Sequence, residues 1–84
     1  MNLVRITWVD ATTTLTPVKI NKAKSLETHL IESVGFHIDS NKDREVIGFQ
    51  FNNNLKEFRY ITIIPREFVK EIEILKNVVS ADKK

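Results

Sequence analysis

The stretch ITIIPREFVKEI, residues 61–72, decides the fold of this 84-residue chain. An apolar run stops at Pro65, a short polar turn follows, and apolar residues then resume. Proline cannot donate a hydrogen bond within a sheet, so it is tolerated mainly at strand ends. The pattern is typical of the passage from the penultimate to the last strand of a small closed β-barrel. Residues 69–75 are predicted to be that last strand, with a helix as the alternative because apolar residues there also recur at helical spacing.

Alternating apolar and polar residues predict further strands. Val4, Ile6 and Trp8 alternate with polar neighbours, and Phe49 and Phe51 belong to a later strand with an aromatic inner face. The four strands before the last one are expected at residues 3–9, 31–39, 46–52 and 58–64. The sequence therefore predicts a mainly β fold of five strands.

Two polar segments, residues 39–43 and 52–54, are expected to turn the chain. Aspartate, serine and asparagine bond to their own backbone in turns, and asparagine tolerates a positive φ. The strand that follows, residues 58–64, is apolar on both faces: Phe58, Tyr60 and Ile64 on one, and Arg59, Ile61 and Ile63 on the other. Such a strand is either central and covered on both sides or lies at a subunit contact.

The segment between the first two strands is less regular. Residues 10–16 are polar and Pro17 closes them. A short strand is expected at residues 18–20, and Ser25 is expected to cap a brief helix because its oxygen can bind an orphan amide. A basic rim on this loop consists of Lys19, Lys22 and Lys24.

Length and composition predict one small domain, residues 1–76, followed by a frayed polar tail, residues 77–84. A chain of this size buries only about 60–65% of its unfolded surface, and it has no cysteine for a disulfide. Stability must then come from efficient packing or from association with further copies of the chain, and we expect a homo-oligomer. No apolar run approaches the roughly 20 residues of a membrane span, and the N-terminus does not look like a signal peptide. A cytoplasmic protein is expected, and its net charge of +2 gives nucleic-acid binding modest support.

Catalytic and metal-binding patterns are incomplete in this sequence. Asp39, Asn41 and Asp43 match the first positions of a calcium loop, but Arg44 replaces its glycine and Gln50 its glutamate. The two histidines have no cysteine to complete a zinc site, and no serine lies in a G-x-S-x-G elbow. We therefore expect no enzyme, no metal and no cofactor.

Binding residues are sought among aromatic and charged side chains. Trp8 could stack a planar ligand beside Asp10, although a single tryptophan in a small domain is more often core. Arg59 and Tyr60 could combine base stacking with phosphate neutralisation, or belong to a core strand flanked by solvated lysines. The ligand-binding candidates are Arg5, Trp8, Asp10, Lys19, Lys22, Arg59, Tyr60 and Arg66.

Two resemblances add to these patterns. Five short strands, a long polar first loop and the sequence Ile64-Pro65-Arg66 resemble the SH3-like or Sm-like small barrel, in which a one-turn 3₁₀ element precedes the last strand. Sm-like proteins usually carry arginine-glycine at this point, whereas this chain has Arg66-Glu67. The chain also resembles small uncharacterised phage-encoded proteins with a V-x-W-x-D-A opening and an I-P-x-x-x-V-x-x-I ending. The matching segments are RITWVDA (residues 5–11), VGF (34–36) and IPREFVKEI (64–72).

The resemblance implies a viral accessory role. The leading hypothesis is a non-catalytic, oligomeric binding protein that sequesters a host factor, with a nucleotide immune signal held between subunits as the most economical ligand. One alternative is an Sm-like RNA-binding ring. Another is a protein-binding inhibitor or virion assembly factor whose interface is the apolar outer side of the fourth strand.

Overall fold

The computed structural model describes residues 1–11 and 16–78, which contain five strands, one short helix and one 3₁₀ turn. In chain order these are β1 (Asn2–Asp10), α1 (Ile20–Lys24), β2 (His29–Ser40), β3 (Arg44–Asn52), β4 (Glu57–Pro65), η1 (Arg66–Phe68) and β5 (Val69–Asn77). The prediction of a mainly β fold with five strands is confirmed. The preference for a strand over a helix at residues 69–75 is confirmed as well.

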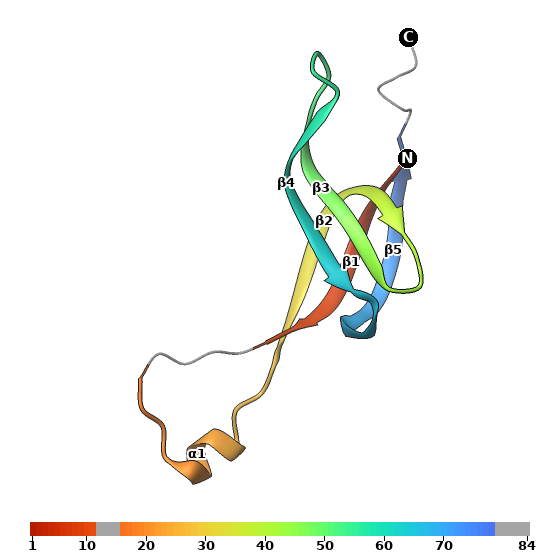
Figure 1. Cartoon of the computed structure of the whole chain (residues 1–84). Helices are drawn as coiled ribbons and strands as arrows, with labels where there is room; N and C mark the ends of the chain where they lie inside the picture. Colours follow the sequence, from red (N-terminus) through yellow and green to blue (C-terminus); the bar gives the residue numbers. More distant parts are fainter. Residues whose placement is uncertain (12–15, 79–84) are drawn as a thin grey trace.

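The five strands form one antiparallel sheet in the order β4-β3-β2-β1-β5. The long strand β2 serves both halves of it, because residues 29–36 pair with β1 and residues 36–40 pair with β3. The sheet curls about β2, so that the β1–β5 half faces the β3–β4 half (Figure 1). A side chain at Gly35 would begin 2.7 Å from the Gly48 carbonyl oxygen, so only glycine allows β2 and β3 to approach this closely. The sheet is open, with β4 and β5 as its edges.

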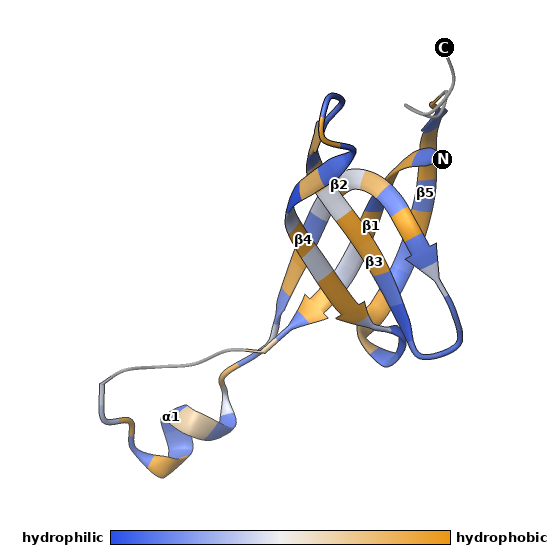
Figure 2. Ribbon diagram, turned by 45° about the horizontal axis from the view of Figure 1, so that its top comes forward, coloured by the Kyte–Doolittle hydropathy of each residue, from blue (hydrophilic) through white to orange (hydrophobic). Residues whose placement is uncertain are grey.

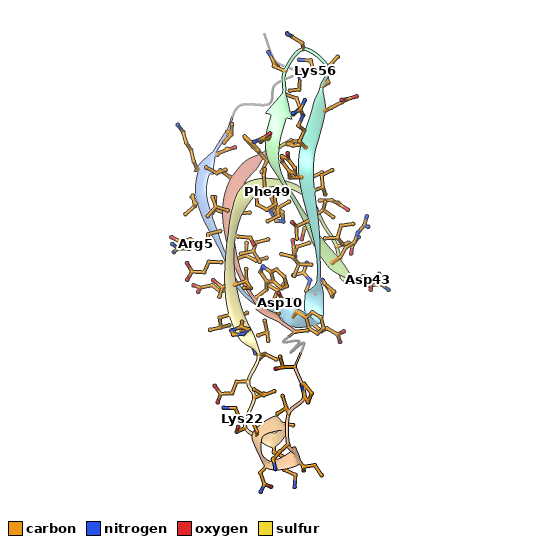
Figure 3. All side chains as sticks on the ribbon, turned by 90° about the vertical axis from the view of Figure 1, so that its left-hand side faces the viewer. Arg5, Asp10, Lys22, Asp43, Phe49 and Lys56 are labelled. Carbon is orange, nitrogen blue, oxygen red and sulfur yellow. The ribbon has the colours of Figure 1, made fainter. Side chains whose placement is uncertain are left out.

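The hydrophobic core lies between the two halves of the sheet. Four aliphatic residues from three strands are fully buried: Val4, Ile6, Ile47 and Ile64. Partly buried side chains pack around them: Trp8, Phe49, Val69 and Ile72. Phe49 points into the space between the halves in Figure 3. Burying one such aliphatic side chain contributes about 1.5–3 kcal/mol to folding, so this cluster is the main source of stability.

A second, smaller cluster of aromatic rings lies near the turn of the β3–β4 hairpin, where Phe51 is paired with Phe58. The Phe58 ring centroid is 4.9 Å from that of Phe51 and 5.8 Å from that of Phe36, both in tilted arrangements. Aromatic pairs at these separations attract one another beyond their buried area. These contacts fasten the hairpin to β2.

Residues 16–28, here called the arm, project from the sheet between β1 and β2 (Figure 1). The predicted short strand at residues 18–20 is wrong, since Ile20–Lys24 is helical, and Ser25 follows this helix instead of capping the start of a later one. Its hydroxyl donates to the Lys22 carbonyl oxygen (2.7 Å). A helix this short is marginal without tertiary contacts, and α1 has no buried residue. The part of the predicted polar loop at residues 12–15 lies outside the described residues.

The β2 strand begins at His29, in the segment after Ser25 where a brief helix was expected. Leu30 is opposite Val9 and Ile31 is opposite Trp8 in the β1–β2 ladder. Pairing gives both segments backbone hydrogen bonds together with contacts to the rest of the sheet. A short isolated helix with no apolar surface to pack on lacks these contacts and is marginal in water. The strand ends at Ser40, close to the predicted end at residue 39.

Both predicted turns are present. The Asn41 side-chain oxygen accepts from the Asp43 and Arg44 N–H groups (2.8 and 3.0 Å), which closes the β2–β3 hairpin. The Asn52 side-chain oxygen likewise accepts from the N–H groups of residues 54 and 55. The expected positive φ at an asparagine is wrong, because the left-handed residue of this turn is Lys56 (φ 57°). The asparagines turn the chain by accepting hydrogen bonds, which needs no left-handed backbone.

The molecule is elongated. Its radius of gyration is 16.5 Å, against about 12 Å for a compact domain of this length. The arm and the β3–β4 hairpin extend in opposite directions from the curled sheet, as Figure 1 shows. In the part of the chain that the structure describes, no helix is long and apolar enough to cross a membrane. Asn77 and Val78, the first described residues after the predicted domain end at 76, lie beside the N-terminus: Asn77 pairs with Asn2, and the Val78 N–H donates to the Met1 carbonyl oxygen. Residues 79–84 of the predicted tail lie outside the described part.

Candidate functional site

The eight ligand-binding candidates do not gather at one place on a single chain. They are spread over four elements: Arg5, Trp8 and Asp10 on β1, Lys19 and Lys22 in or beside α1, Arg59 and Tyr60 on β4, and Arg66 in η1. The arm and the β3–β4 hairpin lie at opposite ends of a molecule 59 Å long (Figures 1 and 3). A single copy therefore offers several separate surfaces.

Trp8 belongs to the packing of the sheet. Its ring is partly buried against the core cluster, and its Nε1–H donates to Ser33 Oγ on the neighbouring strand (3.1 Å). A tryptophan with its ring packed and its one donor paired holds β1 to β2. Asp10 ends β1, and its carboxylate accepts from the Ala11 N–H (2.8 Å).

Arg5 lies on the outer side of the sheet and points away from it in Figure 3. Its guanidinium forms an ion pair with Glu73 on the adjacent strand β5. The two side chains are 42% and 47% exposed. This pair joins two neighbouring strands across the surface.

Arg66 takes part in a polar cluster built around Glu45, which is fully buried. The Glu45 carboxylate pairs with the Arg66 guanidinium, lies 2.6 Å from His37 Nε2, and accepts from Ser40 Oγ (2.9 Å). Arg66 also donates to the Asn41 carbonyl oxygen through Nε and an Nη (3.2 and 2.6 Å). This cluster fastens η1, which connects β4 to β5, onto the β2–β3 hairpin.

The sequence interpretation did not identify the buried carboxylate, although a signal was present. Glu45 is in phase with Ile47 and Phe49 on β3, and alternation puts every second residue of a strand on the same face. A carboxylate on a core-facing position needs a cationic or hydrogen-bonding partner. The partner of this carboxylate could not be deduced from the sequence, because Arg66 lies 21 positions further along the chain.

The arm carries most of the unbalanced charge of the described chain. Its three lysines and one glutamate give it a net charge of +2, whereas residues 1–11 and 29–78 together have eight basic and nine acidic residues. Lys19, Lys22 and Lys24 have no ion-pair partner among the described residues. Three aliphatic residues of the arm are exposed as well: Val18, Ile20 and Leu26. The arm is thus basic with apolar side chains between the charges.

The strand β4 carries a cluster of exposed apolar residues, here called the β4 patch: Tyr60, Ile61 and Ile63. They are 69%, 52% and 56% exposed. Figure 2 shows β4 as largely orange toward its C-terminal end. Arg59 lies next to the patch, and its guanidinium has no hydrogen-bond or ion-pair partner within residues 1–11 and 16–78. A central position for this strand, one of the two expected possibilities, is wrong, because β4 is an edge.

Tyr60 has an unusual backbone conformation. Its φ is 57°, although it lies within a strand between the paired residues Arg59 and Ile61. A bulky residue in the left-handed region is a strained exception and costs on the order of 1–3 kcal/mol. By alternation Tyr60 is in phase with Phe58 and the buried Ile64, yet its side chain is 69% exposed. The strain therefore accompanies an exposed aromatic side chain on an edge strand.

Other possible sites are poorly developed. Within the described ranges, no three side chains of histidine, aspartate or glutamate come together in a way that could hold a metal ion. A shallow, open hollow on the β3–β4 hairpin is lined by Gln50, Phe51, Asn52 and Arg59. Because it lies beside the β4 patch, it extends that surface toward the tip of the hairpin.

Comparison with known proteins found no match: no family model, no curated protein and no solved structure resembles this chain significantly.

Proposed function

We propose that this protein is a non-catalytic binding module that engages another protein through the β4 patch. The single observation behind this proposal is the exposure of three adjacent large apolar side chains on one edge strand, at 52–69%. Contiguous exposed apolar surface is a common property of protein interaction sites. Tyrosine and arginine are the residue types enriched at the energetic centres of interfaces, and Tyr60 and Arg59 are both here.

The fold that we propose for this module is the SH3-like or Sm-like small barrel. In its support, the strands follow one another as a meander, a 3₁₀ turn connects β4 to β5, and β5 returns to pair with β1. The arm corresponds to the long first loop of that fold. A phage-type accessory role, in the cytoplasm of a host cell, rests on the resemblance of the opening and closing segments of the sequence, residues 5–11 and 64–72.

A second candidate function is binding of an anion, either a nucleotide immune signal or RNA. It is supported by the unbalanced charge of the arm and by its three lysines without an ion-pair partner in the described chain. The candidate residues are dispersed on one copy, so a nucleotide site would require a homo-oligomer in which two copies each supply part of it. RNA binding would fall steeply with salt as counterions are released. Replacing Lys19 and Lys22 with glutamine should weaken either kind of binding, and titration with a nucleotide set and with single-stranded RNA tests both.

The protein-binding proposal is tested by capture from host lysate with three immobilised variants. Ile61→Lys combined with Ile63→Lys places charge in the β4 patch. Ile74→Lys is the matched control, because Ile74 is equally exposed (62%) but lies on the opposite edge, β5. We expect quantitative mass spectrometry to find a protein retained by the native chain and by the control and lost from the β4 double variant. Retention of the same proteins by all three forms, or by none, contradicts the proposal.

A further inference from the structure

We propose that the partner binds to β4 by strand addition, as an extended segment that pairs with the free edge of β4 along residues 61–64 and carries a carboxylate directed at Arg59. This inference rests on the protein-binding function proposed above and specifies its geometry. It identifies the occupant as an extended peptide segment of another protein, with apolar side chains alternating along it.

The first support is the position of β4 in the sheet. It is the last strand on its side, and no described segment lies beyond it. In an edge strand, alternate N–H and C=O groups have no strand partner and are a template for one. A partner that adds a strand gains affinity from these main-chain groups and specificity from its alternate side chains.

The second support is the composition of this edge. Residues 60–64 contain no charged side chain, whereas exposed edges are commonly blocked by charges or proline. The blocking residues of β4 lie at its ends, with Arg59 before this segment and Pro65 after it. The left-handed backbone at Tyr60 (φ 57°) interrupts the strand at the same place. The straight part of the edge therefore has room for about four paired residues, from 61 to 64.

The third support is charge. Arg59 is exposed and has no ion-pair partner in the described part of the chain, and it stands at the end of the free segment beside the exposed Tyr60 ring. A carboxylate on the incoming segment would complement this guanidinium with a directional, charge-assisted contact. The segment that fits best is therefore short, alternating and apolar, with aspartate or glutamate at the end near Tyr60.

A library of random 12-residue peptides provides the probe. The native protein is used to select binders, and the tightest one is synthesised in three forms: unmodified, and with backbone N-methyl groups at alternate residues in either of two phases. In strand addition only one phase of N–H groups faces β4. We therefore expect one methylated peptide to bind about tenfold or more weakly and the other to bind like the unmodified peptide. Amide hydrogen exchange should slow at alternate residues of β4 when the unmodified peptide is bound.

Matched protein variants separate failure of this inference from failure of the proposed function. Strand addition is overturned if the Ile61→Lys/Ile63→Lys variant loses binding while the native protein binds both methylated peptides equally well. The β4 patch then remains the interface. Selected peptides that bind this double variant and Ile74→Lys alike, or a selection without enrichment, overturn both. For the carboxylate, we expect Arg59→Gln and replacement of the peptide acid by its amide each to weaken binding a few fold, and the two together no further. Enrichment of basic peptides would overturn this part.

Discussion

The two edge strands of the sheet, β4 and β5, differ in how charged and apolar residues are distributed along them. β5 interleaves charges with apolar residues throughout: Lys70, Glu71, Glu73 and Lys76. One of these charges, Glu73, is held in an ion pair with Arg5 of the neighbouring strand. β4 has five consecutive uncharged residues, 60–64, with three large apolar side chains exposed among them. An edge with regular charges is protected against further pairing, so β4 is the less protected of the two edges.

The largest effect on stability is expected at η1, the junction between the two edges. Arg66→Ala should lower the free energy of unfolding by about 3 kcal/mol, because it leaves the fully buried Glu45 carboxylate without its cation. The exposed part of the Arg66 side chain, 40%, keeps the effect at the lower end of the range for buried pairs. Urea unfolding measures it, with Arg44→Ala as the control, since Arg44 forms only a long, exposed pair with Asp39 (3.6 Å). A loss below about 1 kcal/mol would mean that His37 and Ser40 alone satisfy Glu45.

A smaller effect, with a diagnostic sign, is expected at Tyr60. Glycine in a strand is normally less stable than alanine by roughly 0.5–1 kcal/mol. At Tyr60 the positive φ should reverse this order, so that Tyr60→Gly is more stable than Tyr60→Ala by about 1 kcal/mol. The same pair of substitutions at Lys76 on β5 should show the normal order. Thermal and urea unfolding of the four variants give the order of their stabilities. If the alanine variant is more stable than the glycine variant at both positions, Tyr60 is not strained.

The smallest effect is expected for the ion pair on the β5 side. Arg5 and Glu73 are both close to half exposed, and surface pairs of this kind contribute about 0.2–1 kcal/mol. Arg5→Ala should therefore cost less than about 1 kcal/mol, and the difference should shrink in ~1 M salt because the pair is screened. Unfolding at low and high salt gives the comparison. A larger, salt-independent loss would show that Arg5 stabilises β5 through packing of its aliphatic part.

Much of the fold could be predicted because burial on one face imposes a period of two. The alternation around Val4, Ile6 and Trp8 gave β1 within one residue at each end, and the proline at 65 located the junction before β5 correctly. The region between β1 and β2 was less predictable. There a brief helix was expected after Ser25, but residues 29–34 pair with β1 instead.

The candidate surfaces were harder to predict than the strands. Arg66 was selected as a ligand-binding residue, and its guanidinium is paired with Glu45, a partner that no local pattern reveals. The outer side of β4 was recognised as apolar, but its exposure depends on which strands neighbour it. The exposure of Tyr60, which is in phase with the buried Ile64, accompanies a positive φ that no sequence pattern indicated.

The sequence by itself determined the number of strands, the places where the chain turns and the phase of the core residues on β1 and β3. These depend on interactions between near neighbours in the chain and on the period of the backbone, and the local sequence specifies both. Only the tertiary structure decided that β4 is an edge, that Glu45 and Arg66 meet, and that the arm stands away from the sheet. These depend on contacts between residues far apart in the chain, which no local pattern encodes.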